Sequence, residues 1–369
     1  MTKLIALAAA VAAASIAVLP GGVLRSSPGA ASSTLVTQQA IEDFKAGFAS
    51  ASTASLVIQL QDTLRANPKD QHSYLLLGLA YEQRARETGD PSYYTKADGA
   101  LRRAHSLDSG DSLVYSGLGS LALSRHRFRD ALSLGERARA LSPSTARNYG
   151  VIGDALVELG RYQEAFRAFD RMNDLRPSLA SYARTSYARE LLGRTGAAVR
   201  AMKLAADAAV GEAEPTAWVH VQLGKLHFNH GRYEAARHEY EIALQAFPGY
   251  AYAIDALAQA EAAEGRLGRA IGLEQRAVET IPLPQYVGFL GDLYRVTGRR
   301  QLAARQYGLI GAIEKLLQAA GVQTDLEIAL FQADHRIDLR GALARARLAH
   351  EERLGRSLFI RSNAAKASE

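Results

Sequence analysis

The 369-residue sequence contains no cysteine. This absence excludes disulfides, thiolate metal sites, cysteine nucleophiles and a lipid-modified amino-terminal cysteine. Aromatic residues are also scarce, at 7% of the chain with a single tryptophan, whereas 48% of the residues are hydrophobic and many of those are alanine. We therefore expect a core built from small side chains and stabilised by packing alone.

The sequence also lacks the motifs that usually mark catalytic sites. It has no glycine-rich phosphate loop, nucleophile elbow, zincin motif or kinase signature. The step Asp334-His335-Arg336 stands alone and is more typical of a surface than of a catalytic centre. Four histidines lie close together, but no carboxylate follows them at zinc-type spacing on the same helix: His220, His227, His230 and His238. We therefore expect no catalytic residues, no cofactor and no metal site.

A glycine-arginine step recurs along the chain, each time between two helical patterns. The steps are Gly160-Arg161, Gly193-Arg194, Gly231-Arg232, Gly265-Arg266 and Gly298-Arg299. Their spacing of about 34 residues is that of a helix-turn-helix unit, which must stack on copies of itself to bury its apolar face. The longest gap, before Gly231, indicates an insertion at residues 210–216. These steps therefore predict turns in one elongated array.

The residues within each unit follow a common pattern: small where two helices approach, bulky between them, and proline at the end. The unit from Ala146 carries it in Tyr149, Ile152, Gly153, Leu156, Ala165, Phe169, Met172 and Pro177. The unit from Ala217 carries it in His220, Leu223, Gly224, His227, Ala236, Tyr240, Ala243 and Pro248. This pattern resembles that of tetratricopeptide repeats over residues 38–354. The resemblance implies an all-α fold, a right-handed superhelical α-solenoid of helix-turn-helix repeats.

We predict three segments in the chain. Residues 1–33 form a signal peptide or amino-terminal anchor with a linker, residues 34–354 form the solenoid, and residues 355–369 form a basic tail. The repeat units are expected near 38–70, 71–111, 112–145, 146–178, 179–216, 217–250, 251–283, 284–320 and 324–354. The unit at 71–111 is longer than the others, and its extra residues are expected in a loop around Glu87 to Ser92.

The amino-terminal segment predicts export. Lys3 precedes an apolar run over residues 4–19, which is shorter than the roughly 20 residues that span a bilayer as a helix. No clear small-residue cleavage site follows, so a cleaved signal and an uncleaved anchor at residues 4–19 both stay open. We expect the protein in the cell envelope, the periplasm or outside the cell.

The resemblance also implies where a ligand binds, because the first helix of each tetratricopeptide unit lines a concave groove. The residues at groove positions are Arg147, Asp154, Arg184, Tyr187, Trp218, Gln222, Lys225, Asn229, Tyr252, Asp255, Gln259, Asp292 and Arg295. Trp218 is either a binding anchor or a packing residue at the insertion. Lys225 and Asn229 lack the companions in adjacent units that a carboxylate clamp of this family requires.

These observations predict a non-catalytic scaffold that binds a peptide or protein segment in the groove, outside the cytoplasm. The alternative is an envelope-associated accessory protein that binds anionic polymer or membrane through the basic region at residues 336–366. Nucleic acid is not an expected partner, because the export signal removes the chain from it and the basic region has only Phe359 as an aromatic.

Overall fold

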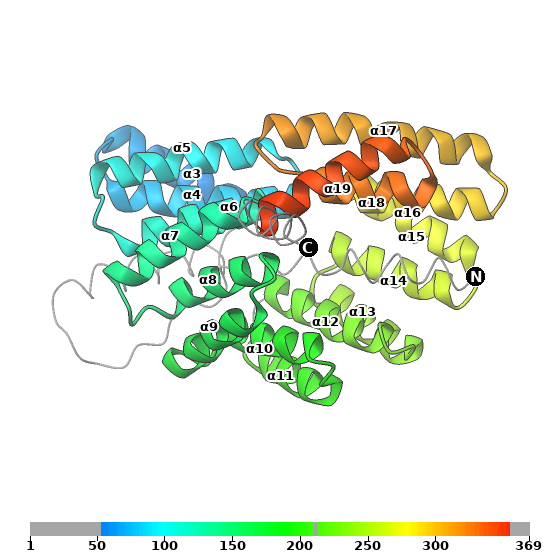
Figure 1. The fold of residues 1–369 in the computed structure, drawn as a ribbon, viewed down its shortest axis with the longest axis horizontal. Coiled ribbons are helices and arrows are strands. Elements are labelled where there is room, and N and C mark those ends of the chain that lie inside the picture. Colours follow the sequence, from blue (N-terminus) through cyan, green and yellow to red (C-terminus); the bar gives the residue numbers. More distant parts are fainter. Residues whose placement is uncertain (1–52, 210–212, 355–369) are drawn as a thin grey trace, which may run out of the picture.

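The computed structural model describes residues 53–209 and 213–354, without the side chains of Glu352 and Leu354. Within these ranges the chain forms α-helices joined by short connections and no strand (Figure 1). The all-α solenoid expected from the repeat pattern is therefore confirmed. Several predictions lie outside the described residues: the signal or anchor at 1–33, the first part of the unit expected near 38–70 and the basic tail at 355–369.

The helices pair in chain order. Seven of the eight described pairs lie within the expected units, whereas α12 begins at Ala213, four residues before the unit expected at 217–250 and within the insertion expected at 210–216. The first helices of the pairs are α4 (Gln71–Thr88), α6 (Ser112–Ser124), α8 (Ala146–Glu158), α10 (Leu179–Leu191), α12 (Ala213–Phe228), α14 (Ala251–Ala263), α16 (Pro284–Val296) and α18 (Asp325–His335). The second helices are α5 (Ser92–Leu107), α7 (Phe128–Leu141), α9 (Tyr162–Leu175), α11 (Thr195–Asp207), α13 (Tyr233–Ala246), α15 (Leu267–Thr280), α17 (Arg300–Ala319) and α19 (Leu339–Leu354), and α3 (Thr53–Ala66) precedes them.

The turns within the pairs need a left-handed residue. The glycines of the five glycine-arginine steps all have φ between 69° and 82°, which a residue without a Cβ adopts at little cost. The turn between α6 and α7 has His126 at this position instead, with φ of 58°. A histidine in this region is uncommon and indicates that surrounding contacts hold it there.

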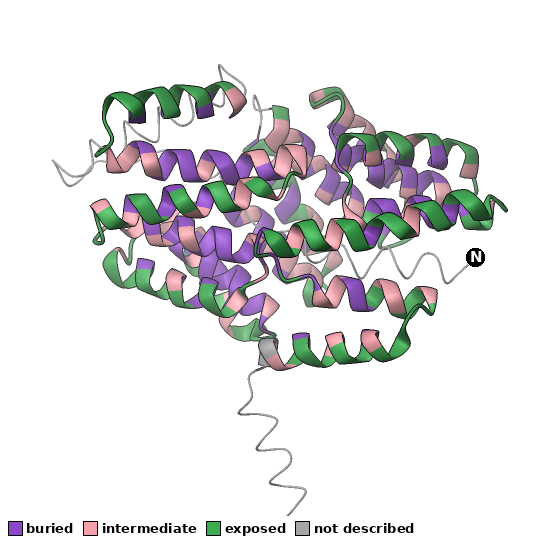
Figure 2. Ribbon diagram, turned by 90° about the horizontal axis from the view of Figure 1, so that it is seen from above, coloured by how far each residue is buried: buried purple, intermediate pink, exposed green. Residues whose placement is uncertain are grey.

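Small residues set the distance between the two helices of a pair. A Cβ added to Gly153 would overlap the ring of Phe169, and one added to Gly224 would overlap the ring of Tyr240. Both aromatic rings are fully buried, so the glycine and the ring form one packed layer. Buried residues follow the helix faces that meet neighbouring helices, and exposed residues follow the outer faces (Figure 2).

The array curves until its last helices meet its early ones (Figure 1), and Arg353 of α19 lies over the ring of Phe128 of α7. The Gln323 backbone N–H donates to the Arg125 carbonyl at 3.0 Å, and the His126 ring Nδ1 donates to the Gln323 carbonyl at 2.8 Å. Arg353 of α19 lies 3.4 Å from Glu158 of α8. We call the contacts of Gln323 with Arg125 and His126, together with that of Arg353 with Glu158, the closure seam. They join the two ends of the described array, so that the superhelix forms a closed turn.

A second contact crosses the superhelix at the end of α4. The extra residues of this unit were expected as a loop around Glu87 to Ser92, but that prediction is wrong: α4 continues to Thr88. The added helical turn carries the Arg86 carbonyl to the Tyr252 hydroxyl, which donates to it at 3.3 Å. Gly89, at the end of this helix, lies against Ile281. The insertion therefore bridges two distant units.

We expect Gly224→Ala to lower the free energy of unfolding by about 1–3 kcal/mol, because the added methyl overpacks the layer with Tyr240. Gly272 of α15 is the matched control, since a Cβ there meets nothing within 4 Å. Gly272→Ala should raise stability by up to about 1 kcal/mol through helix propensity. Urea unfolding followed by circular dichroism measures both, and a neutral or stabilising Gly224→Ala would contradict the close-approach explanation.

Candidate functional site

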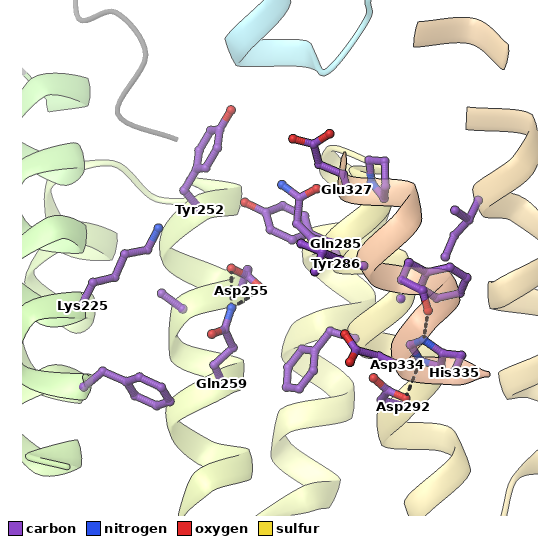
Figure 3. Close-up of a pocket in the computed structure, with 18 of the residues that line it drawn as sticks. Lys225, Tyr252, Asp255, Gln259, Gln285, Tyr286, Asp292, Glu327, Asp334 and His335 are labelled. Carbon is purple, nitrogen blue, oxygen red and sulfur yellow. Dashed lines mark hydrogen bonds and ion pairs between the residues drawn. The ribbon is translucent and has the colours of Figure 1, made fainter. Parts of the chain in front are cut away.

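The candidate site is the space enclosed by α4, α12, α14, α16 and α18, which we call the inner groove. It contains a smaller cavity of about 150 Å³ and a larger one of about 380 Å³. Lys225, Tyr252, Gln285 and Glu327 line both cavities, so the two meet at these side chains. Figure 3 shows the smaller cavity, with Lys225 extending from α12 toward Asp255 and Tyr252.

The structure brings most of the predicted groove residues together. The smaller cavity is lined by Lys225, Asn229, Tyr252, Asp255, Gln259 and Asp292. The larger cavity is lined by Trp218, Gln222, Lys225 and Tyr252. Neither cavity includes Arg147, Asp154, Arg184, Tyr187 or Arg295. The groove positions implied by the family therefore divide into a cavity-lining set and a set with other contacts.

Asp154 and Arg184 form an ion pair between consecutive units. Arg184 Nε and Nη2 donate to the two carboxylate oxygens of Asp154 at 2.9 and 2.6 Å, and both residues are more than nine-tenths buried. Burial raises the pKa of Asp154, and the charge of Arg184 partly offsets that shift. The expectation that both side chains face an open groove is therefore wrong. Their bidentate geometry fixes the position of α10 against α8.

A cluster of carboxyl groups lies beside the smaller cavity, on α14 and α15. Gln259 donates to both oxygens of Asp255, at 2.9 and 3.0 Å. Burial raises the pKa of Asp255 to about 6, while the bonds from Gln259 and the charge of Lys225 act in the opposite direction. Glu274 is fully buried, its oxygens have no hydrogen-bond partner among the described residues, and burial raises its pKa well above the usual range. Burial therefore favours the neutral form of Glu274.

Asp292 organises the other end of the smaller cavity. It accepts hydrogen bonds from Tyr307 at 2.8 Å and from His335 Nε2 at 3.0 Å. Burial alone would raise the pKa of Asp292, but these bonds outweigh it and the pKa is lowered. His335 Nδ1 also donates, to the Phe331 carbonyl at 2.7 Å. Because both ring nitrogens face acceptors, the charged form of His335 is favoured and its pKa is raised. His335 joins α18 to α16, so the expectation of a surface residue is wrong.

Trp218 combines the two roles considered for it. It is half-buried and packs against two core clusters, one around Tyr240 and one around Met202. It also lines the larger cavity together with Tyr252. The packing fixes the indole ring, and the remaining exposed part is available at the cavity wall.

Two of the four clustered histidines bond to side chains of neighbouring helices. His220 Nδ1 donates to Glu239 of α13 at 2.7 Å, and His230 Nε2 lies 2.6 Å from the Thr195 hydroxyl. In the part of the chain that the structure describes, no group of three or more His, Asp or Glu side chains is arranged to hold a metal ion. These imidazoles contribute to packing between helices and between units.

Several cavity residues were missed by the sequence interpretation. Gln285 and Phe289 of α16 occupy the second and sixth positions of their unit, as Trp218 and Gln222 do in the unit from Ala217. The same positions would therefore have identified them. Arg86 and Glu327 follow no such rule. They reach the inner groove only because the superhelix closes, which the repeat pattern does not encode.

Comparison with known proteins agrees with this architecture. A family model described as tetratricopeptide repeat matches residues 116–180 and 221–286. The chain is 29% identical over 184 residues to anaphase-promoting complex subunit 7 of Arabidopsis thaliana, which covers 50% of this chain and 32% of that protein. The crystal structure of the APC/C hetero-tetramer Cut9-Hcn1 superposes with a TM-score of 0.57 at 14% identity, over 78% of this chain and 56% of that one.

A shorter solved structure, that of the type IV pilus biogenesis factor PilW, gives a TM-score of 0.46 at 16% identity, over 56% of this chain and 97% of that one. The chain spans about a third of the length of the curated relative and little more than half of the Cut9 structure. The chain therefore contains tetratricopeptide repeats at the matched residues, and its turn glycines and helix pairs continue the same architecture along the described array. None of the described helices is long and apolar enough to cross a membrane.

We expect Asp255→Asn to stabilise the protein at pH 7.5 and to make little difference at pH 4. The folded-state pKa of Asp255, about 6, lies above its unfolded value, so ionisation destabilises the folded state as the pH rises through this window. At about 1.4 kcal/mol for each pKa unit, the gain at pH 7.5 is at most about 3 kcal/mol.

The measurement is the urea midpoint of both proteins from pH 4 to pH 7.5. Asp174→Asn, on the exposed face of α9, is the control for a lost carboxylate without burial. A gain for Asp255→Asn that is the same at both ends of the pH range would contradict the assignment.

Proposed function

We propose that the protein is a non-catalytic scaffold that binds an extended protein segment in its inner groove. The observation that carries this proposal is the meeting of two cavities at Lys225, whose ammonium has no hydrogen bond or ion pair with any described residue. Aromatic and amide side chains surround it, including Trp218, Tyr252 and Gln285. Apolar walls with a few convergent polar groups are typical of binding sites.

The size of the groove limits what it holds. Together the two cavities provide roughly 500 Å³, within the range of about 300–1,000 Å³ that is typical of ligand sites. This space suits a few side chains of a partner. A whole helix, about 10 Å across with its side chains, would require the closure seam to open.

The relatives support a protein partner. Tetratricopeptide repeats mediate protein–protein interactions, and the relatives named above include a subunit of one complex and part of a hetero-tetramer. A location outside the cytoplasm is part of the proposal and rests on residues 1–33 of the sequence.

The alternative, binding of anionic polymer or membrane through the basic region, has less support. Within α19, Arg345 lies 2.6 Å from Glu314 and 3.2 Å from Asp325, and Arg353 lies 3.4 Å from Glu158. Arg345 and Arg353 therefore form ion pairs within the protein. Arg340 and Arg347 are exposed and remain available to an anionic partner.

Affinity capture with the full chain tests the proposal. From an envelope extract of the source organism, we expect a defined partner whose recovery falls at least tenfold in Trp218→Ala and in Gln222→Arg, which fills the larger cavity with a charged side chain. Tyr162→Ala, an exposed aromatic on the outer face of α9, should leave recovery unchanged. Thermal melts of each variant separate lost binding from lost folding.

Equal recovery of the partner by Trp218→Ala, Gln222→Arg and Tyr162→Ala would contradict binding in the inner groove. The double variant Arg340→Gln/Arg347→Gln then identifies the alternative: a partner lost in this variant, and lost in the parent at high salt, binds the basic face of α19. Arg184→Glu is not a suitable probe, because it would break the buried pair with Asp154.

A further inference from the structure

The closure seam is held by a few polar contacts. The Gln323 backbone bonds to the Arg125 carbonyl at 3.0 Å and to the His126 ring at 2.8 Å. Arg353 lies 3.4 Å from Glu158. The side chains of Arg353, Glu158 and His126 are 29%, 19% and 23% exposed, so water reaches these contacts. Polar contacts that water can replace contribute little net stability.

Apolar packing joins consecutive units but does not cross the seam. One buried cluster runs from Leu123 of α6 through Phe169 of α9 to Ala188 of α10, and so connects three units. Among the described residues, no cluster of buried apolar side chains combines α5 to α8 with α17 to α19. Because apolar burial is the main stabilising term, the seam is weaker than the contacts between neighbouring units.

The seam also encloses a cavity of about 500 Å³ that is separate from the two cavities of the inner groove. Its apolar wall comes from both ends of the array, with Phe128 and Leu159 from one end and Leu326 and Leu348 from the other. Leu348 remains 48% exposed. Side chains that line such a space lose the dispersion contacts that close packing supplies.

Charged groups of both ends also meet at the seam. The charges of Arg353 and His126 favour the ionised form of Glu158, whereas those of Asp154 and Glu327 disfavour it. Burial has the largest effect and raises the pKa of Glu158, so closing the seam around the ionised carboxylate is costly. The other charged residues of the cavity wall carry both signs: Arg127, Arg129, Asp130, Asp325 and Glu351.

The crossing at the end of α4 must part when the array opens. It consists of the 3.3 Å bond from the Tyr252 hydroxyl to the Arg86 carbonyl and the contact of Gly89 with Ile281. In the described part of the chain, no buried apolar cluster combines α4 with α14 or α15. Opening therefore breaks few contacts on this side as well.

The seam forms part of the wall of the inner groove, since His126, Thr324 and Glu327 line its larger cavity. A partner chain must thread into a closed turn from one of its own ends. An open turn instead admits an internal segment of that chain from the side.

We propose that the closure seam is a latch, at which the superhelix opens to admit an internal segment of a partner chain from the side and then closes over it. Small rotations at the unit interfaces add up along a solenoid, so the ends separate with little change at any one interface. This inference rests on the proposed groove function and concerns how the partner enters the groove.

The absence of cysteine allows two dyes to be attached at chosen positions of the full chain. Ser133→Cys and His350→Cys place one dye on each side of the seam, at exposed positions of α7 and α19. Ser133→Cys and Gln163→Cys, on α7 and α9, form a control pair that does not span the seam. Single-molecule energy transfer should show an additional population of low efficiency for the seam pair alone.

We expect His126→Gly to raise the ratio of open to closed molecules by about fivefold or more, because the bond to Gln323 is lost. Glycine occupies the same place in five other turns, so the turn itself should keep its conformation. Arg353→Gln should raise the ratio by about threefold. Arg340→Gln, at an exposed position of the same helix, should leave it unchanged. A single population that persists in both seam variants, or equal broadening for the control pair, would overturn the latch.

A locked form tests entry of the partner. Asp130→Cys and Glu351→Cys line the seam cavity from its two sides, and a bismaleimide joins them. Locking before contact with the partner should reduce recovery in affinity capture at least tenfold, whereas locking after binding should retain the partner. The same double variant capped with N-ethylmaleimide is the control and should recover the partner as the parent does.

The failure of the latch differs from the failure of the scaffold. If recovery depends on Trp218 and Gln222 but is unchanged by locking before contact, the groove function stands and the latch is refuted. If the seam opens but neither the groove variants nor locking alter recovery, the groove function is refuted, and with it entry of the partner through the seam.

Discussion

The closure seam is the contact on which the inner groove depends. The bonds from Gln323 to Arg125 and from His126 to Gln323 join the two ends of the described array, and the inner groove lies inside the turn that they close. The turn that makes this contact is also the one that replaces the repeated glycine. His126 adopts a left-handed conformation that costs energy for a residue with a Cβ, and its ring uses that position to reach the carboxy-terminal unit. The turn in which histidine replaces the repeated glycine is therefore also the turn that contacts the last unit and closes the array.

Closure also changes how the repeats share stability. In an open solenoid each unit contacts its neighbours alone, and stability is close to a sum of local terms. Here α19 contacts α8 through Arg353 and Glu158, and α4 contacts α14 through Arg86 and Tyr252. These long-range contacts link the early units to the late ones. Unfolding one end of the array therefore exposes surface at the other end, which favours more cooperative behaviour than the repeat pattern alone implies.

The sequence predicted the features that depend on neighbouring residues in a unit. Gly153 and Gly224 indicated close helix pairs, and the glycine-arginine steps indicated the turns, because both follow from local backbone and side-chain geometry. The sequence did not predict which groove residues stay accessible. Asp154 and Arg184 occupy groove positions of the repeat but pair across two units, and only their three-dimensional distance reveals this. Arg86 was not predicted for the same reason, because its partners lie on the opposite side of the closed superhelix.

Several acids in and around the groove are paired with donors on neighbouring helices. Asp154, Asp292 and Glu87 each accept bonds from neighbouring side chains, so their charges are satisfied inside the protein. Lys225 has no hydrogen bond with any described residue, although Asp255 acts on its charge and burial lowers its pKa. It lies where the two cavities meet, and one of these cavities is also lined by Arg86 from the far side of the superhelix. Because residues from distant units line this space, the shape of the groove depends on closure of the superhelix.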